Sequence, residues 1–236
     1  MKRWIQMRSI LETNIGEIVK IREDNIPTEF IVIQKGDPFL NNARYENGTY
    51  ILPKDIPSPT YVGFRHGVTL LRKDIHSVGW FDPYNHYYNI SDLHKWCNEK
   101  YLNLIQEDIR NAIQPVYIPY SNGTREFVYV RYNGLKCKAF ILSMAEVNLT
   151  DPCAPSEGVA FTYFKDCEDD KRMTNFNNSP KYWWLRTPYT NQPRAAWHIM
   201  KDGRPAMFTT FEYYGRRPAF VLSESLSIDH EGNVML

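Results

Sequence analysis

Histidines and cysteines most often carry metal or proton-transfer chemistry, and in this sequence they are scattered. No two histidines form a His-Glu-x-x-His motif, and no Cys/His cluster has metal-ligand spacing. The cysteines, Cys97, Cys137, Cys153 and Cys167, are too few and too far apart for a disulfide framework. The sequence also lacks a Gly-x-Ser-x-Gly turn, a phosphate-binding loop and a Gly-x-Gly-x-x-Gly motif. We therefore expect no metal, no cofactor and none of the common acyl-transfer or nucleotide sites.

A group of aromatic, arginine and proline residues in the last third of the chain is the most informative pattern. Two adjacent tryptophans on a strand point to opposite faces, so one must lie in the core and the other at the surface or under a neighbouring loop. Two arginines each stand between apolar residues and a proline, which favours a fixed guanidinium bonded to loop carbonyls or to a carboxylate. We predict that this group stabilises rigid turns and does not contact a ligand directly. These structural-motif residues are Trp183, Trp184, Arg186, Pro188, Gly215, Arg217 and Pro218.

The interval between these motifs, 189–214, combines aromatic side chains with hydroxyl, amide and basic groups. Aromatic and arginine side chains dominate binding hot spots, because they bring a large contact area at low entropic cost. We therefore predict that this interval faces a ligand. The candidate ligand-binding residues are Tyr189, Asn191, Arg194, Trp197, His198, Phe208, Thr210, Phe211, Tyr213 and Tyr214.

Short strands and one clear helix are expected to position these segments. The β-branched runs at 18–21 and 30–33 predict a β-hairpin with its turn at 22–27. Ser91 can cap a helix that extends to Leu104, since its apolar residues recur every three or four positions. We expect a second short helix at 107–113, and a loop at 36–59 with at most one strand, at 50–52. Further strands are predicted at 68–71, 116–118, 127–132 and 135–142, with a hairpin between 226–228 and 234–236.

The length suits a single all-β or α+β domain, and the predicted elements favour an α+β domain of short antiparallel strands, one or two helices and long loops. We place this domain at 15–236, after an N-terminal arm at 1–14. A net charge of +1 disfavours a nucleic-acid partner. No apolar run approaches the roughly 18 residues of a membrane span, so membrane insertion is not expected. No apolar leader follows the basic N-terminal residues, which predicts synthesis in the cytoplasm without a signal peptide.

The two C-terminal motifs resemble the signature of a known family. The segments 184–188 (Trp-Leu-Arg-Thr-Pro) and 215–220 (Gly-Arg-Arg-Pro-Ala-Phe) are similar to the WLRSP and GxRPAF motifs of the DUF6273 domain, found in bacterial, prophage and gut-phage proteins. The likeness extends upstream and covers most of the chain after Ile15. It implies a C-type-lectin-like fold, related to formylglycine-generating enzymes and to receptor-binding proteins diversified by retroelements. It also raises the hypothesis that 189–214 is a diversified interval.

Three functions follow as hypotheses. The favoured one is a non-catalytic display or receptor-binding protein, in the setting of the resemblance a phage or prophage tail protein, whose partner is a protein or glycan on a cell surface. The second is a structural particle component that uses its aromatic face as a homo-oligomer contact. The third is an enzyme acting on a cell-wall or small substrate through Arg186, His198 and Glu212.

Two activities of related folds are disfavoured. Formylglycine-type oxidation uses a pair of C-terminal cysteines, and this chain has no cysteine after Cys167. Calcium-dependent sugar binding uses an acidic triplet, and Asn191-Gln192-Pro193 has the wrong order and no acidic residue.

Overall fold

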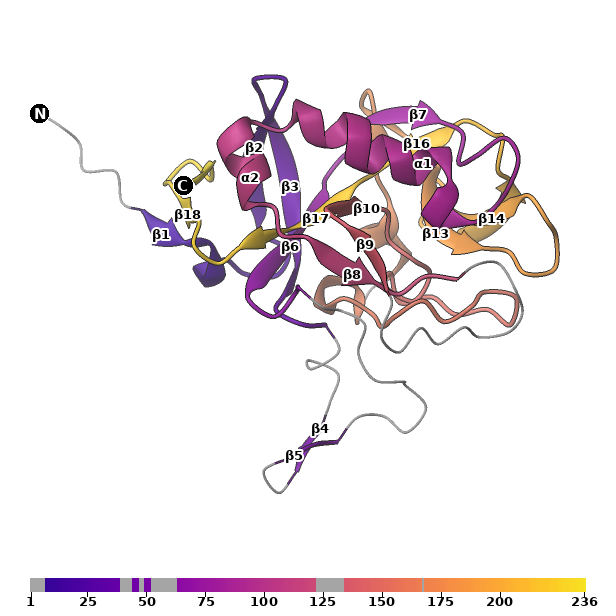
Figure 1. Cartoon of the computed structure of the whole chain (residues 1–236), viewed down its shortest axis with the longest axis horizontal. Helices are drawn as coiled ribbons and strands as arrows, with labels where there is room; N and C mark the ends of the chain where they lie inside the picture. Colours follow the sequence, from indigo (N-terminus) through magenta and orange to yellow (C-terminus); the bar gives the residue numbers. More distant parts are fainter. Residues whose placement is uncertain (1–6, 39–43, 47–48, 52–62, 122–133, 167) are drawn as a thin grey trace, which may run out of the picture.

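The computed structural model of this protein describes residues 7–38, 44–46, 49–51, 63–121, 134–166 and 168–236. Two five-stranded sheets form its framework, and the chain passes repeatedly from one to the other. A helical segment runs across these sheets, with its first turn beside one edge of the second sheet (Figure 1). The mixture of short strands, short helices and long loops confirms the α+β class.

The first sheet is antiparallel throughout and contains most of the early strands. Its order is β10 (Ala139–Phe140), β17 (Ala219–Ser223), β6 (Gly67–Arg72), β3 (Ile26–Lys35) and β2 (Ile18–Glu23). The strand predicted at 68–71 is confirmed as β6, and its apolar side chains are buried. This burial on both faces explains why the segment is a continuous apolar run and not an alternating one.

The hairpin predicted at the start of the domain is confirmed as β2 and β3. Its turn is shorter than 22–27, because Glu23 pairs with Ile26 and only Asp24 and Asn25 lie between them. Both turn residues have positive φ, 48° and 65°. A two-residue turn of this kind matches the twist of the flanking strands, and Asp and Asn tolerate the left-handed conformation better than most residues do.

The predicted helix from Ser91 to Leu104 is confirmed in position, but it is not uniform. It begins as α1 (Asp92–Lys95), widens into the π-helical turn η4 (Trp96–Lys100) and tightens into the 3-10 turn η5 (Tyr101–Leu104). The Ser91 hydroxyl accepts a hydrogen bond from the His94 amide at 3.1 Å, as expected of an N-cap. The second predicted helix is α2 (Glu107–Ala112).

The second sheet contains the two C-terminal motifs. Its order is β15 (Pro205–Thr209), β14 (Ala195–Ile199), β13 (Trp183–Pro188), β16 (Tyr214–Arg216) and β7 (Ser77–Gly79). β13 and β16 pair in parallel, with Trp183 opposite Gly215, and the other pairs are antiparallel. All six residues of β13 are buried. The two motifs, separated in sequence, therefore lie side by side at the centre of this sheet.

Shorter elements complete the described part of the chain. The predicted hairpin at 226–236 is confirmed, and its first strand also pairs with Arg8–Ser9 in the N-terminal segment. The expectation of at most one strand in 36–59 is wrong, because two short strands pair there as a hairpin. The strand predicted at 127–132 lies outside the described residues. The remaining elements are β1 (Arg8–Ser9), η1 (Ile10–Glu12), β4 (Arg44–Glu46), β5 (Thr49–Ile51), η3 (Tyr88–Ile90), β8 (Val116–Ile118), β9 (Leu135–Cys137), η6 (Thr162–Phe164), η7 (Asp169–Arg172), β11 (Asn175–Phe176), β12 (Ser179–Pro180), β18 (Ser227–Ile228) and β19 (Val234–Met235).

Across the described ranges, none of the helices has the length and apolar character that a membrane span requires.

Candidate ligand-binding site

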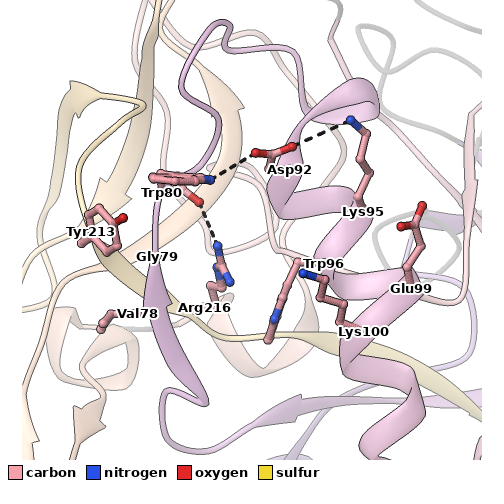
Figure 2. Close-up of a pocket in the computed structure, with 10 residues that line it drawn as sticks. All are labelled: Val78, Gly79, Trp80, Asp92, Lys95, Trp96, Glu99, Lys100, Tyr213 and Arg216. Carbon is pink, nitrogen blue, oxygen red and sulfur yellow. Dashed lines mark hydrogen bonds and ion pairs between the residues drawn. The ribbon is translucent and has the colours of Figure 1, made fainter.

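A pocket of about 480 Å³ opens between the helical segment and the β7 edge of the second sheet. Three aromatic side chains, Trp80, Trp96 and Tyr213, come to it from three separate parts of the chain (Figure 2). Charged groups surround them, two carboxylates and three basic side chains. The lining residues are Val78, Gly79, Trp80, Asp92, Lys95, Trp96, Glu99, Lys100, Tyr213 and Arg216.

Backbone contacts fix the loop that carries Trp80. The amides of Phe81 and Asp82 both donate to the Thr210 carbonyl, at 2.9 and 3.1 Å, and the Leu93 amide donates to the Phe81 carbonyl at 3.0 Å. The buried carboxylate of Asp82 also accepts from the amide of Asp92, at 3.2 Å. The loop after β7, the start of α1 and the turn at Thr210 are therefore joined, and Trp80 has a defined position.

Asp92 is held by two neighbours at the mouth of the pocket. The indole Nε1 of Trp80 donates to its Oδ2 at 3.1 Å, and Lys95 Nζ lies 3.8 Å from its Oδ1 (Figure 2). On the other side, the rings of Trp80 and Tyr213 meet at 5.4 Å with an interplanar angle of 68°. These contacts form an aromatic corner next to a carboxylate whose two oxygens already have partners.

Arg216 lies between the two tryptophans (Figure 2), and it is partly buried, whereas Lys95, Glu99 and Lys100 are exposed. Its guanidinium lies over the Trp96 ring, 5.0 Å from the ring centroid, and its Nη2 donates to the Trp80 carbonyl at a long 3.4 Å. Gly79 makes room for it, since a Cβ at this position would overlap the guanidinium and lie 2.7 Å from Nε. Burial lowers the pKa of Arg216 below its ordinary value.

The candidate ligand-binding residues predicted from sequence do not form one surface. Phe208, Phe211 and Tyr213 are about half exposed, at 48%, 51% and 55%. Asn191 and Arg194 are exposed in the turn between β13 and β14, while Tyr189 is partly buried against Trp197. Trp197, His198 and Thr210 are buried, at 6%, 3% and 0% exposure. Only Tyr213 of the predicted set lines the pocket.

An aromatic cluster occupies the same face of the sheet as the pocket. His198 lies opposite Trp184 in the β13 and β14 pair, and its ring is 4.5 Å from that of Tyr214. Burial lowers the pKa of His198 to about 4, so the imidazole is neutral at physiological pH. Tyr214 also contacts Trp184, at 4.7 Å. His198 is thus buried in the packing of the sheet, and Tyr214, which is partly buried, covers it.

The predicted bonding of the two motif arginines is confirmed. Arg186 is fully buried and bonds the two oxygens of Glu146, at 2.6 and 2.7 Å. It also donates to the carbonyls of Pro119, Ile141 and Glu157. These five hydrogen bonds use all five N–H donors of the guanidinium, so Arg186 holds the loops around β13 together.

Arg217 performs a similar task with fewer partners. It donates from Nε to the carbonyl of Arg72 at 2.9 Å and stacks over Trp183 at 4.9 Å. Trp183 donates to the Arg172 carbonyl and Trp184 to that of Gly79, each at 2.9 Å. Both tryptophans are fully buried. Trp184 lies against Phe81 in the loop after β7, which agrees with the prediction that one of the two tryptophans lies at the surface or under a neighbouring loop.

The three residues of the enzyme hypothesis lie in different surroundings. Arg186 is committed to Glu146, His198 is buried among aromatic rings, and Glu212 precedes the pocket-lining Tyr213. The residues that the structure describes also contain no group of three or more His, Cys, Asp or Glu side chains able to hold a metal ion.

The sequence profile of a domain of unknown function, DUF6273, matches residues 66–224. This chain belongs to the DUF6273 family. No curated protein and no solved structure matches it. The part of the chain matched to DUF6273 includes both C-terminal motifs and every residue that lines the pocket.

Sequence reasoning missed three central residues of the pocket in this DUF6273 protein, Trp80, Trp96 and Arg216. Trp96 is one of the apolar residues whose spacing predicts the helix after Ser91, and it does pack on His76 and Tyr101, at 5.3 Å from each ring. Arg216 was overlooked beside the motif arginine Arg217. One signal was available, because successive residues of an extended segment point to opposite sides, which predicts that Arg216 points away from the Arg217 side.

Proposed function

We propose that this protein is a non-catalytic binding protein whose ligand enters the pocket formed by Trp80, Trp96 and Tyr213. The observation that carries the proposal is the meeting of three aromatic side chains with five charged ones in one fixed pocket. Pockets for small ligands combine apolar or aromatic walls with a few oriented polar groups, and typically have volumes of about 300–1,000 Å³.

The lining chemistry favours recognition of a sugar unit. Val78 is the one aliphatic side chain among the ten lining residues, so the pocket does not suit an aliphatic group. Lysine and arginine donate hydrogen bonds and carboxylates accept them, which suits the hydroxyl groups of a saccharide. Aromatic rings supply flat apolar area and little conformational entropy is lost when a ligand packs on them.

Exposed aromatic residues towards the opposite edge of the second sheet extend this proposal to a larger ligand. In the pairing of β14 with β15, Phe208 lies opposite Ala196, and His198 is two residues along β14 on the same face. Phe208 and Phe211 are about half exposed, so a glycan held in the pocket has further aromatic area within the same C-terminal segment. We propose a glycan on a cell surface as the partner.

The wider setting is proposed from the family resemblance. A C-type-lectin-like scaffold displayed on a phage or prophage tail, with variation in 189–214, is consistent with the order of elements, a hairpin, a helix and a strand-rich C-terminal half. Comparing residues 189–214 among related isolates tests the variation, and uniform residues there would remove that part of the proposal.

A glycan array together with whole-cell binding tests the proposed function. We expect Tyr213→Ala to weaken binding at least tenfold, because it removes one wall of the aromatic corner. Tyr84→Ala is the matched control, since Tyr84 is 77% exposed and does not line the pocket. Equal binding by the wild type and Tyr213→Ala would refute the proposal.

A second function, an oligomer contact, has one observation in its favour. β15 forms the edge of the second sheet, and Met207 and Phe208 on it are 38% and 48% exposed. Exposed apolar edge strands readily pair with another chain. Size-exclusion chromatography with light scattering distinguishes the cases, because a Phe208→Lys variant that dissociates a stable oligomer would favour the structural role.

A further inference from the structure

Arg216 has more hydrogen-bonding capacity than the described residues use. A guanidinium has five N–H donors, and Arg186 shows what full use looks like. In the described part of the chain, Arg216 donates one hydrogen bond, the 3.4 Å contact with the Trp80 carbonyl, and its buried Nε has no partner there. No carboxylate of the described residues lies within ion-pair distance of it. Arg216 is therefore a cation in the pocket wall without a directly bonded carboxylate.

The guanidinium is also held in place. Gly79 lies against it on the sheet side and the Trp96 ring covers one of its faces at 5.0 Å. A guanidinium fixed between two surfaces loses little entropy when it binds a planar anion through two N–H groups. Partial burial has already removed much of its water, and this lowers its pKa. An anion that approached it would restore the lost interactions.

The other charged residues of the pocket compensate this cation only in part, through the longer-range attraction of Asp92. Asp92 has Trp80 and Lys95 as partners. Glu99 and Lys100 are exposed on η4, and they are of opposite sign. The partly compensated charge in the pocket wall is thus positive, next to an aromatic corner and hydrogen-bonding groups.

We propose that the pocket selects an acidic sugar, with the carboxylate of the sugar paired to the Arg216 guanidinium and its ring in the corner between Trp80 and Tyr213. This inference rests on the proposed binding function and specifies its ligand class. A peptide with a free C-terminal carboxylate has the same anionic group, but a saccharide offers more hydroxyl groups to the lysines and carboxylates of the lining.

The test compares the binding of acidic oligosaccharides with the binding of their neutral methyl esters. The probes are oligosaccharides that contain uronate or sialate, each paired with its carboxyl-methyl ester, together with peptides that end in a free carboxylate. We expect the acid to bind about 10 to 100 times more tightly than its ester, the range of one hydrogen-bonded charge pair. Raising the salt concentration should weaken binding of the acid more than binding of the ester.

Arginine variants assign this preference to one side chain. Arg216→Gln should bind the acid and the ester equally, and Arg216→Lys should keep part of the preference, because it keeps the charge and loses the paired N–H groups. Arg65→Gln is the control, since Arg65 is exposed and outside the pocket. Thermal unfolding of each variant shows whether it is folded. If Arg216→Gln is unfolded, Arg216→Lys is used in its place to test the preference for the acid.

The possible outcomes separate this inference from the proposed function. Binding that requires Tyr213 but is equal for acids and esters, or is unchanged in Arg216→Gln, overturns the acidic-sugar inference and leaves the binding function standing. Binding of the peptides in place of every acidic sugar also overturns the inference. Failure of all saccharides, neutral and acidic, to bind counts against the proposed function itself.

Discussion

Replacing Gly79 with alanine tests how Arg216 is positioned. The three atoms nearest to an added Cβ all belong to the Arg216 guanidinium, which would have to move. This movement gives up the cation–π contact with Trp96, about 0.5–1 kcal/mol, and the long bond to the Trp80 carbonyl, about 0.5 kcal/mol. Alanine in a strand meanwhile gains about 0.5–1 kcal/mol over glycine. The net effect on the wild type should be between neutral and about 1 kcal/mol destabilising.

Gly79→Ala should increase the free energy of unfolding when Arg216 is absent. In an Arg216→Ala background there is no guanidinium to displace, so Gly79→Ala should stabilise the protein by about 0.5–1 kcal/mol. The coupling energy between the two positions is then about 1–1.5 kcal/mol, well above the roughly 0.5 kcal/mol within which independent sites add.

Urea unfolding of the four proteins, followed by circular dichroism, measures this coupling. Gly79→Ala should also weaken binding of an acidic sugar as strongly as Arg216→Gln does, while the protein stays folded. If Gly79→Ala changes the free energy of unfolding equally in both backgrounds, the guanidinium does not lie across Gly79 and the positioning argument fails.

Three further predictions concern the scaffold. Arg186→Met should lower the free energy of unfolding by about 3–5 kcal/mol, because it leaves the buried Glu146 charged and unpaired. Adding Glu146→Leu to this variant should recover part of the loss. A loss below 1 kcal/mol in urea unfolding of Arg186→Met would contradict the prediction. Burial raises the pKa of Glu157 from 4.5 to about 7, so the folded protein keeps a proton that the unfolded chain releases. The bound proton contributes about 3 kcal/mol to the free energy of unfolding. This contribution is fully present below pH 4.5 and is lost as the pH rises to 7. Glu157→Gln should abolish that decline in thermal unfolding between pH 5 and 7.5, and an unchanged decline would show another group to be responsible. Gly203 and Gly232 both have positive φ, 85° and 86°, but only at Gly203 would an added Cβ overlap a backbone carbonyl, that of Asp169. Gly203→Ala should therefore lower the free energy of unfolding in urea by about 2 kcal/mol more than Gly232→Ala does. Equal losses would exclude the overlap.

Features encoded in neighbouring residues were predictable from the sequence. The hairpin followed from two β-branched runs around Asp24 and Asn25, and the helix start from Ser91. The bonding of Arg186 and Arg217 followed from their apolar and proline neighbours. Each of these depends on local conformational preference, which acts whatever the rest of the chain does.

The pocket depends on contacts between distant segments, so its composition was not predictable. Trp80 reaches it through the bonds that Phe81 and Asp82 make to Thr210, and nothing local to Trp80 encodes them. The same contacts bury Thr210, which a purely compositional argument placed on the ligand surface. Aromatic content located the C-terminal segment, and the tertiary structure decides which of its rings face outward.

The place of β17 in the first sheet affects how the chain folds as it is made. β17 lies between β6 and β10 and pairs with both, yet it is synthesised after all the strands of the second sheet. Until residues 219–223 leave the ribosome, β6 has one unpaired edge and the first sheet is incomplete. Pairings between such distant segments form slowly, and open strand edges are prone to wrong partners in the meantime. A nascent chain that stalls before β17 should therefore be a substrate for chaperones, although its β2 and β3 hairpin is already complete.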